Sequence, residues 1–349
     1  MRLEPRPHVP PGLRIGAPVA AALVAFGLSA VPIAATGAPV LEAYALLLQG
    51  AFGSTFALAE TLTRATPLIL TGLAVAIAFR ANLWNIGAEG QLYAGALAAV
   101  MIGGGALSLP APLLLPAVLV AGAAAGALLL LVPTLLKLRF GVDEVVTTLL
   151  LNFVVLLFVQ MMLEGPLQDP MGMGWPQSAP VIGAAELPRL IPRTRVHAGL
   201  LLALVLAVAA WLYAERTTWG LQARAVGTGV AAARYAGMNV TAILLRTALI
   251  SGGLAGLAGV SEIAGLRGYL TQDLSPGFGY SGIVVAMLAQ LNPLGCVLSA
   301  LFIAGVFVGA DSMSRALGVS SYLANLIVAT SLLTMLLAGL FTRYRLRRG

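Results

Sequence analysis

Long apolar stretches, separated by shorter polar ones, recur along almost the whole chain. A helix needs about 20 mainly apolar residues to cross the hydrocarbon core of a bilayer, so this pattern predicts about ten spans. They cover residues 15–35, 62–79, 86–103, 112–136, 144–163, 198–214, 243–264, 280–291, 294–310 and 322–341. A weaker stretch, residues 41–59, is expected to lie at the membrane interface or to re-enter the membrane. The predicted fold class is therefore all-α, a polytopic transmembrane helix bundle that forms a single domain of residues 1–349.

The composition supports this fold class, because 59% of the residues are hydrophobic and only 9% are charged. Soluble domains carry about a quarter charged residues. The net charge of +7 is better explained by topology than by nucleic-acid binding, since cytoplasmic loops collect Arg and Lys. The basic residues that mark both termini and two loops as cytoplasmic are Arg2, Arg6, Arg14, Lys137, Arg139, Arg216, Arg224, Arg234, Arg343, Arg345, Arg347 and Arg348. Arg189, Arg193 and Arg195 are exceptions, because counting spans places the polar stretch 164–197 outside.

The N-terminal span could be confused with a secretory signal, since basic residues precede it. The apolar core of a signal is roughly 7–15 residues long. Residues 15–35 exceed that length, so we expect a retained helix, with a cleaved signal as the alternative.

Sequence motifs for catalysis and for metal or nucleotide binding are missing from the chain. Cys296 is its only cysteine, and His8 and His197 lie far apart, so no metal site and no catalytic residue is predicted. The sequence also lacks a Walker A motif, so this chain is expected to bind no cofactor. Energy from nucleotide hydrolysis would have to come from a partner.

Polar residues inside or next to the spans are the candidates for a translocation path. If residues 82–91 open a helix, Asn85, Glu89 and Tyr93 share a face. Thr148 and Asn152 follow Glu144 at the same four-residue spacing. These groups either line a path or satisfy backbone and neighbouring helices. The path candidates are Asn85, Glu89, Thr148, Asn152 and Tyr280.

Two later stretches depart from a regular polar–apolar pattern. Small residues at 252, 255, 256 and 259 form one smooth helix face that favours close packing, and Glu262 could pair with Arg267 beyond it. Residues 270–280 contain Pro276 and cannot form a regular helix. They either line a cavity or form an ordinary outer loop.

The cytoplasmic segment 215–242 is the most distinctive loop. Residues 231–236 favour a helix that Gly237 would end. A short exposed helix has little burial of its own, so we expect it to dock on another protein; a solvated loop is the alternative.

Several of these stretches carry a family resemblance. They are residues 79–91 (FRANLWNIGAEGQ), 143–148 (DEVVTT) with Asn152, 224–227 (RAVG), 232–237 (AARYAG), 275–280 (SPGFGY) and 292–295 (NPLG). The chain resembles the membrane permeases of bacterial ATP-binding-cassette (ABC) importers of the simple sugar and nucleoside branch. The likeness covers most of residues 60–310 and is closest to nucleoside permeases that work with a lipoprotein-type binding protein. Trp84 departs from the smaller residue that this resemblance leads us to expect.

The resemblance implies a type II importer fold and a specific set of partners. It implies an inner-membrane location with both termini cytoplasmic, a second permease subunit in a homo- or heterodimer, an ATPase subunit that uses ATP and Mg²⁺, and a substrate-binding lipoprotein. It also places a coupling helix in residues 224–238. The residues expected to couple to the ATPase are Gly227, Arg234, Tyr235, Ala236, Gly237 and Met238.

Two further hypotheses stay open from the sequence. The likeness between residues 79–83 and 266–270 indicates an inverted repeat, or it is chance. An ion-coupled secondary transporter, with Glu89 or Glu262 as the coupling acid, is the rival to an ABC permease. A membrane enzyme or scaffold with no transport is disfavoured because the sequence shows no catalytic constellation.

Overall fold

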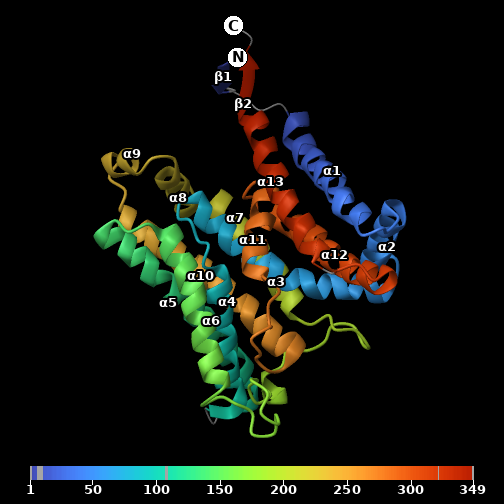
Figure 1. Cartoon of the computed structure of the whole chain (residues 1–349). Coiled ribbons are helices and arrows are strands. Elements are labelled where there is room, and N and C mark those ends of the chain that lie inside the picture. The colour runs from blue at the N-terminus through green and yellow to red at the C-terminus, as the bar shows by residue number, and fades with distance from the viewer. Residues whose placement is uncertain (1, 6–10, 107–108, 321, 348–349) are drawn as a thin grey trace. The chain divides into compact units, whose positions relative to one another are not determined.

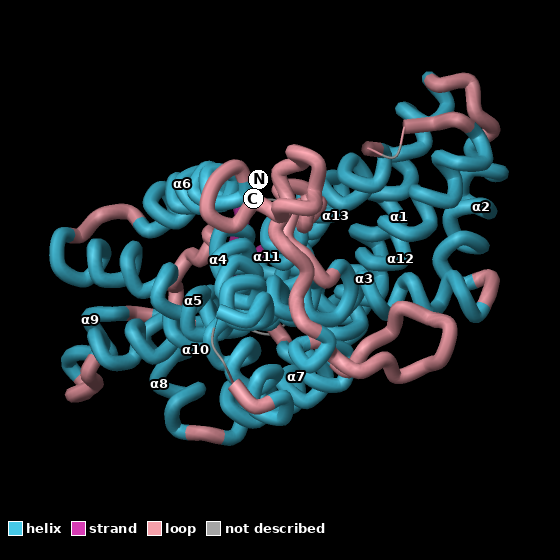
Figure 2. Tube along the Cα trace, turned by 90° about the horizontal axis from the view of Figure 1, so that it is seen from below, coloured by secondary structure: helices cyan, strands magenta, loops and turns pink. Residues whose placement is uncertain are grey.

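The computed structural model describes residues 2–5, 11–106, 109–320 and 322–347, and most of them are helical (Figures 1 and 2). Arg6 and Arg348, which entered the topology prediction, lie outside these ranges. The chain divides into two compact units. One comprises residues 62–300, and the other comprises the residues before and after it. The prediction of one transmembrane domain over residues 1–349 stays a prediction.

The unit formed by the two ends of the chain contains α1 (Pro11–Ala35), α2 (Val40–Phe52) and α13 (Leu323–Arg343), with the start of α3 (Thr55–Arg80) and the end of α12 (Pro293–Leu317). Thr334 on α13 donates a hydrogen bond to the Ala21 carbonyl of α1 at 2.9 Å. Two short strands, β1 (Arg2–Pro5) and β2 (Tyr344–Arg347), pair antiparallel. The hydrophobic pattern did not predict this two-stranded ribbon.

Residues 41–59, expected to lie at the membrane interface or to re-enter the membrane, do not form one regular helix. Helix α2 ends at Phe52 with Gly53 as its C-cap, and α3 begins at Thr55. Helix α2 also bends by 117° from the preceding helix, which makes this pair either a broken span or a re-entrant segment.

The unit of residues 62–300, called the central unit because of its place in the sequence, contains the rest of α3, the start of α12 and the remaining helices. They are α4 (Ala88–Met101), η1 (Ile102–Ala106), α5 (Ala111–Phe140), α6 (Glu144–Leu163), η2 (Gly183–Ala185), α7 (Gly199–Arg216), α8 (Thr218–Thr228), α9 (Val230–Tyr235), α10 (Val240–Glu262), η3 (Ile263–Arg267) and α11 (Phe278–Leu288). Helix α4 is almost wholly buried, and α5, α6, α10 and α11 contact it. It therefore forms the core of the unit.

Glycines let these central helices approach one another closely. A Cβ on Gly95 of α4 would lie 2.1 Å from the Gly256 carbonyl oxygen of α10, and one on Gly259 would lie 1.9 Å from the Leu92 carbonyl oxygen. The backbones are in contact, as small-residue faces permit. The predicted packing role of the small residues at 252–259 is confirmed.

Helices α5 and α6 are joined by a short turn, and residues of that turn cap both helices. Helix α5 ends with Gly141 in the left-handed region, at φ 69°, and Lys137 and Arg139 occupy its last turn. Asp143 then caps α6 by accepting a hydrogen bond from the Val145 backbone N–H at 2.7 Å. This cap fixes the residue at which α6 begins, and the position of that residue determines which side chains of α6 face α4.

The predicted spans all fall on helices, but their lengths differ. Among the described residues, six helices are long and apolar enough to cross a membrane, or up to seven if the bent pair is one span. Helices α4 and α11 are short, with 14 and 11 residues. The chain is therefore an all-helical multi-pass membrane protein apart from its terminal ribbon, and the number of about ten spans stays a prediction.

Candidate functional site

The turn between α3 and α4 brings most of the predicted path residues together. Asn85 lies in this turn and is fully buried. Its amide forms a reciprocal pair with Gln91, at 2.9 and 2.7 Å, and also donates to Ser251 of α10 at 3.0 Å. Ser251 in turn donates to the Ala74 carbonyl of α3. Asn85 therefore links α3, α4 and α10.

The expectation that Asn85, Glu89 and Tyr93 share one helix face is wrong for Asn85. Helix α4 begins at Ala88, after Gly87 as its N-cap, so Asn85 precedes the helix. Its side chain folds back to accept a hydrogen bond from the Gly87 backbone N–H at 3.0 Å. Such local bonds from Asn side chains favour turns and compete with helix formation.

The polar stripe of α6 holds this turn from the other side. Glu144 accepts from the Trp84 backbone N–H, and Thr148 accepts from that of Ile86, both at 3.3 Å. Asn152 accepts from the Gly90 N–H at 2.8 Å and donates to the Ile86 carbonyl at 3.0 Å. All three stripe residues are buried. Asn152 therefore supplies a capping bond that Gly87, which has no side chain, cannot give to α4, while Glu144 and Thr148 hold the turn before the helix.

Glu89 joins the starts of two short helices. Its Oε2 accepts a hydrogen bond from the Gly279 backbone N–H, in the first turn of α11, at 2.6 Å. A Cβ on Gly279 would lie 2.2 Å from the Glu89 backbone nitrogen, so the two helix starts touch. A carboxylate is favoured at a helix N-terminus, and here one carboxylate serves two of them.

Tyr93 and Tyr280 extend this junction. The Tyr93 hydroxyl donates to the Gln272 carbonyl at 2.6 Å and accepts from the Ser275 N–H at 3.1 Å. The Tyr280 hydroxyl accepts from the Asn152 amide at 3.2 Å, and Tyr280 is 37% exposed. Tyr280 is thus the most exposed of the five path candidates, whereas Asn85, Glu89, Thr148 and Asn152 are buried and hydrogen-bonded. Direct contact of any of the five with a solute stays a prediction.

Residues 270–277 are irregular, as expected, whereas residues 278–280 of the same predicted stretch begin α11. The irregular residues pack against the polar stretch 164–197. Ser178 accepts from the Leu270 N–H, and its own N–H donates to the Leu270 carbonyl, both at 2.9 Å. Glu262 and Arg267 form no direct ion pair among the described residues, and Nη1 of Arg267 lies 3.5 Å from Oδ2 of Asp273. A hydrogen bond from Thr271, assisted by the charge of Arg267, holds the pKa of Asp273 below its ordinary value. Oε1 of Glu262 is buried and lacks a hydrogen-bond partner among the described residues.

The segment expected to couple to an ATPase forms helices α8 and α9 (Figure 1). Gly237, at φ 76°, follows α9, as predicted for a residue that ends the helix. The Gly237 N–H donates to the Arg234 carbonyl and the Met238 N–H to the Ala233 carbonyl, both at 3.0 Å. These two bonds form the Schellman motif.

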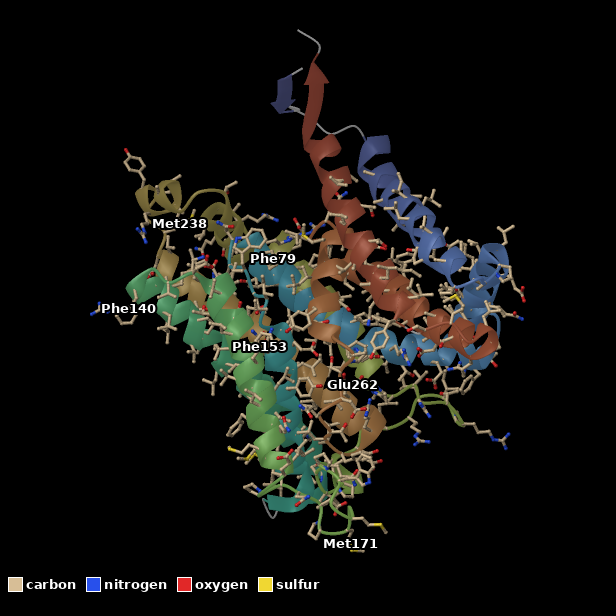
Figure 3. The ribbon with its side chains drawn as sticks, viewed as in Figure 1. Phe79, Phe140, Phe153, Met171, Met238 and Glu262 are labelled. Carbon is tan, nitrogen blue, oxygen red and sulfur yellow. The ribbon has the colours of Figure 1, made fainter. Side chains whose placement is uncertain are left out.

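The side chains of α9 and of the residues that follow it, up to Met238, face in two directions. Ala233 and Met238 pack into a cluster with Phe79, Leu83 and other apolar residues of α3, α5 and α10. Met238 and Phe79 are labelled in Figure 3. Tyr235 is 97% exposed, and Arg234 and Ala236 are exposed with it. Tyr235 is therefore the projecting side chain of α9, whereas Met238 anchors the segment to the bundle.

Helix α9 and the stretch 164–197 lie at opposite ends of α10. Helix α9 leads directly into the start of α10, at Val240. The Val181 and Leu187 backbone N–H groups instead donate to the Gly268 and Ala264 carbonyls, beyond the other end of the same helix. If α10 spans the membrane, the two segments face opposite sides of it.

Comparison with known proteins finds a permease family and relatives that are all named as transport permeases. The family model of branched-chain amino acid transport system permease components matches residues 57–341. The chain is 38% identical to the glucose ABC transporter permease protein TsgB13 of Haloferax volcanii, over 100% of this chain and 95% of the relative. It is 36% identical to the guanosine ABC transporter permease protein NupP of Bacillus subtilis, over 90% and 91% of the two chains. It is 30% identical to the nucleoside ABC transporter permease protein NupB of Lactococcus lactis, over 85% and 84%.

Proposed function

Because the chain belongs to the family of branched-chain amino acid transport system permease components, we propose that it forms the translocation path of an ABC importer for a nucleoside or a simple sugar. The resemblance stated from the sequence motifs is confirmed at the level of this family. A permease is a transport subunit, so the chain's role is to carry solute rather than to catalyse a reaction. The observation that carries the proposal is the near full-length match to ABC transporter permeases.

A nucleoside is the leading substrate class. Two of the relatives described above are named for guanosine or nucleosides, and one for glucose. A nucleobase needs an aromatic ring to stack on and amide or hydroxyl partners beside it. Tyr280 offers a partly exposed ring and a hydroxyl, which the amide of the buried Asn152 holds in place. A simple sugar is the second candidate.

The remaining parts of the assembly follow from the same proposal. A separate ATPase subunit binds ATP and Mg²⁺ and contacts the exposed face of α9, and this chain binds no cofactor. A second permease subunit completes the path, and a lipoprotein delivers the solute at the side of residues 164–197. About ten spans place both termini and the segment 215–242 in the cytoplasm of a bacterial cell, with the likeness of residues 79–83 to 266–270 marking an inverted repeat.

Reconstitution of the complete transporter in liposomes tests this function. With the ATPase subunit and the binding lipoprotein present, we expect uptake of radiolabelled guanosine to require ATP, and unlabelled guanosine to compete better than glucose. Uptake that depends on a proton or sodium gradient and proceeds without ATP would establish the secondary-transporter alternative instead. Better competition by glucose would identify a sugar as the substrate.

A matched pair of variants tests the role of α9. Tyr235→Ala removes the projecting side chain from α9, and Tyr322→Ala removes a tyrosine that is 77% exposed elsewhere in the chain. We expect only Tyr235→Ala to reduce copurification of the ATPase subunit and uptake. An equal effect of both variants, or of neither, would contradict the assignment of α9 as the ATPase contact.

A further inference from the structure

Arg80, at the last position of α3, holds two other parts of the central unit. Its Nη1 donates to Oε1 of Glu215, near the end of α7, at 2.7 Å. Its Nε donates to the Leu291 carbonyl, in the turn between α11 and α12, at 2.8 Å. Its side chain is only 14% exposed, so it is held in place more firmly than most surface arginines.

Glu215 extends this contact to helix α8, the first helix of the segment proposed to couple to the ATPase. Its second oxygen, Oε2, accepts a hydrogen bond from Nη1 of Arg224 on α8 at 2.7 Å, and the same nitrogen donates to the Ala214 carbonyl at 2.9 Å. One carboxylate therefore bridges two guanidinium groups from different helices. Charge-assisted bonds of this kind are roughly twice as strong as neutral ones.

A second contact joins α8 to the same point of α3. A Cβ on Gly227 would lie 2.1 Å from the Arg80 carbonyl oxygen, so the α8 backbone touches the end of α3. Helix α8 is thus tied to Arg80 through its backbone at Gly227 and through Glu215 at Arg224. A rigid shift of α8 must either move the end of α3 or break these contacts.

The turn that Arg80 holds is conformationally strained. Gln290 and Leu291 both have positive φ, 51° and 61°, although neither is glycine. Side chains other than glycine rarely adopt this region, and such strain persists only where surrounding contacts enforce it. The turn ends α11, whose other end is bonded to Glu89. Helix α11 is therefore held at its start by Glu89 and at its end by Arg80.

We propose that Arg80, Glu215 and Arg224 form a relay that transmits movement of α8 and α9 to the end of α3 and to the turn between α11 and α12. They are positioning residues, and this inference rests on the proposed function. The apolar cluster around Met238 holds α9 against the bundle, but it does not include the turn at Leu291. The contact of Gly227 reaches only the backbone of Arg80, whereas the bond to Leu291 comes from the Arg80 side chain, which Glu215 links to Arg224.

Hydrogen–deuterium exchange on the complete transporter tests the relay without identifying the solute. We expect a non-hydrolysable ATP analogue to change the rate of amide hydrogen exchange in peptides that cover residues 215–240 and also in peptides that cover residues 286–294. In Glu215→Ala and Arg224→Ala, the first change should remain and the second should be lost. Arg216→Ala is the matched control, because Arg216 is exposed next to Glu215 and its guanidinium stacks on Trp211 instead. It should behave as the wild type.

Coupling ratios give an independent readout. With guanosine as the probe, the number of ATP molecules hydrolysed per solute taken up should rise about fivefold in either relay variant, because both variants remove the partly exposed charge-assisted bond between Glu215 and Arg224. The double variant should be no worse than either single variant, because both break the same chain of contacts.

The outcomes separate the two proposals. If residues 286–294 respond to nucleotide equally in the wild type and in both relay variants, the relay is overturned. If residues 215–240 do not respond in the wild-type transporter, the proposed coupling of α9 to the ATPase fails, whatever the variants do. Poor folding of Glu215→Ala leaves Arg224→Ala to decide, since Arg224 is the more exposed partner, at 40% against 35%.

Discussion

Asn152→Ala is the substitution that best separates a structural from a solute-binding role for the path candidates. Asn152 lies in α6 and is fully buried, yet it supplies the cap of a different helix. Its Oδ1 accepts from the Gly90 N–H, one of the donors that the start of α4 cannot satisfy by itself. Its amide nitrogen donates to the Ile86 carbonyl and to the Tyr280 hydroxyl. Alanine removes all three bonds.

The loss of folding stability in Asn152→Ala follows from the polar groups that the substitution leaves without hydrogen-bond partners. A buried polar group that loses its hydrogen bond costs about 1–3 kcal/mol. The Gly90 N–H and the Ile86 carbonyl are the two groups affected most, because Tyr280 is a partly exposed residue whose hydroxyl can turn to other partners. We expect Asn152→Ala to destabilise the fold by about 2–4 kcal/mol. For a unit of this size, that corresponds to a fall in melting temperature of about 5–10 °C.

Melting of the purified transporter in detergent, followed by fluorescence-detected size exclusion, measures this fall. Phe153→Ala is the control, since Phe153 is the neighbouring residue on α6 and is 55% exposed (Figure 3). At a temperature where Asn152→Ala stays folded, its KM for guanosine should equal that of the wild type. An unchanged melting temperature together with a raised KM would refute the structural interpretation and make Asn152 a solute contact.

Three further predictions concern other parts of the chain. Gly237→Pro should uncouple ATP hydrolysis from uptake while membrane insertion persists, because proline cannot adopt φ 76° or donate the bond to Arg234; normal uptake would count against the assignment of residues 224–238. Gly259→Ala should lower the yield of folded protein sharply, since its Cβ would lie 1.9 Å from a carbonyl oxygen of α4, whereas Gly253→Ala, with its nearest atom at 3.5 Å, should be tolerated; equal yields would contradict the packing. Burial lowers the pKa of His197 to about 4, below the ordinary 6.5, so its neutral form stabilises the fold above pH 6.5 and this contribution is lost as the pH falls toward 4. Melting at pH 5 should therefore show a loss of about 2 kcal/mol relative to pH 7, and His197→Asn should reduce that loss; the same pH dependence in both proteins would exclude His197 as its source.

Much of the fold could be predicted from the sequence because the relevant signals are local. Each predicted apolar span falls on a helix, and the small residues at 252–259 mark a face where α10 contacts other helices. The end of α9 at Gly237 also follows from local chemistry. The terminal ribbon was missed, because strands of four residues carry too short a pattern to be distinguished from a loop.

The candidate site was predicted less completely, and for a physical reason. The spacing of Glu144, Thr148 and Asn152 correctly places them on one face of α6, but spacing cannot say that this face caps α4. Gln91 and Ser251, which complete the bonding of Asn85, were not selected as site residues. The only signal for Gln91 was its place in the polar cluster 82–91, and Ser251 carried no signal beyond its position in an apolar helix.

The sequence by itself determined the membrane character, the helices and the family, because hydropathy, helix caps and motifs are read along a continuous stretch of chain. Only the tertiary structure decided that Glu89 joins the starts of α4 and α11, and that Arg80 joins α3 to Glu215 and Leu291. Arg80 is separated from Glu215 by 135 positions and from Leu291 by 211. Periodicity fixes which way a side chain points from its own helix, whereas its partner depends on how distant helices pack.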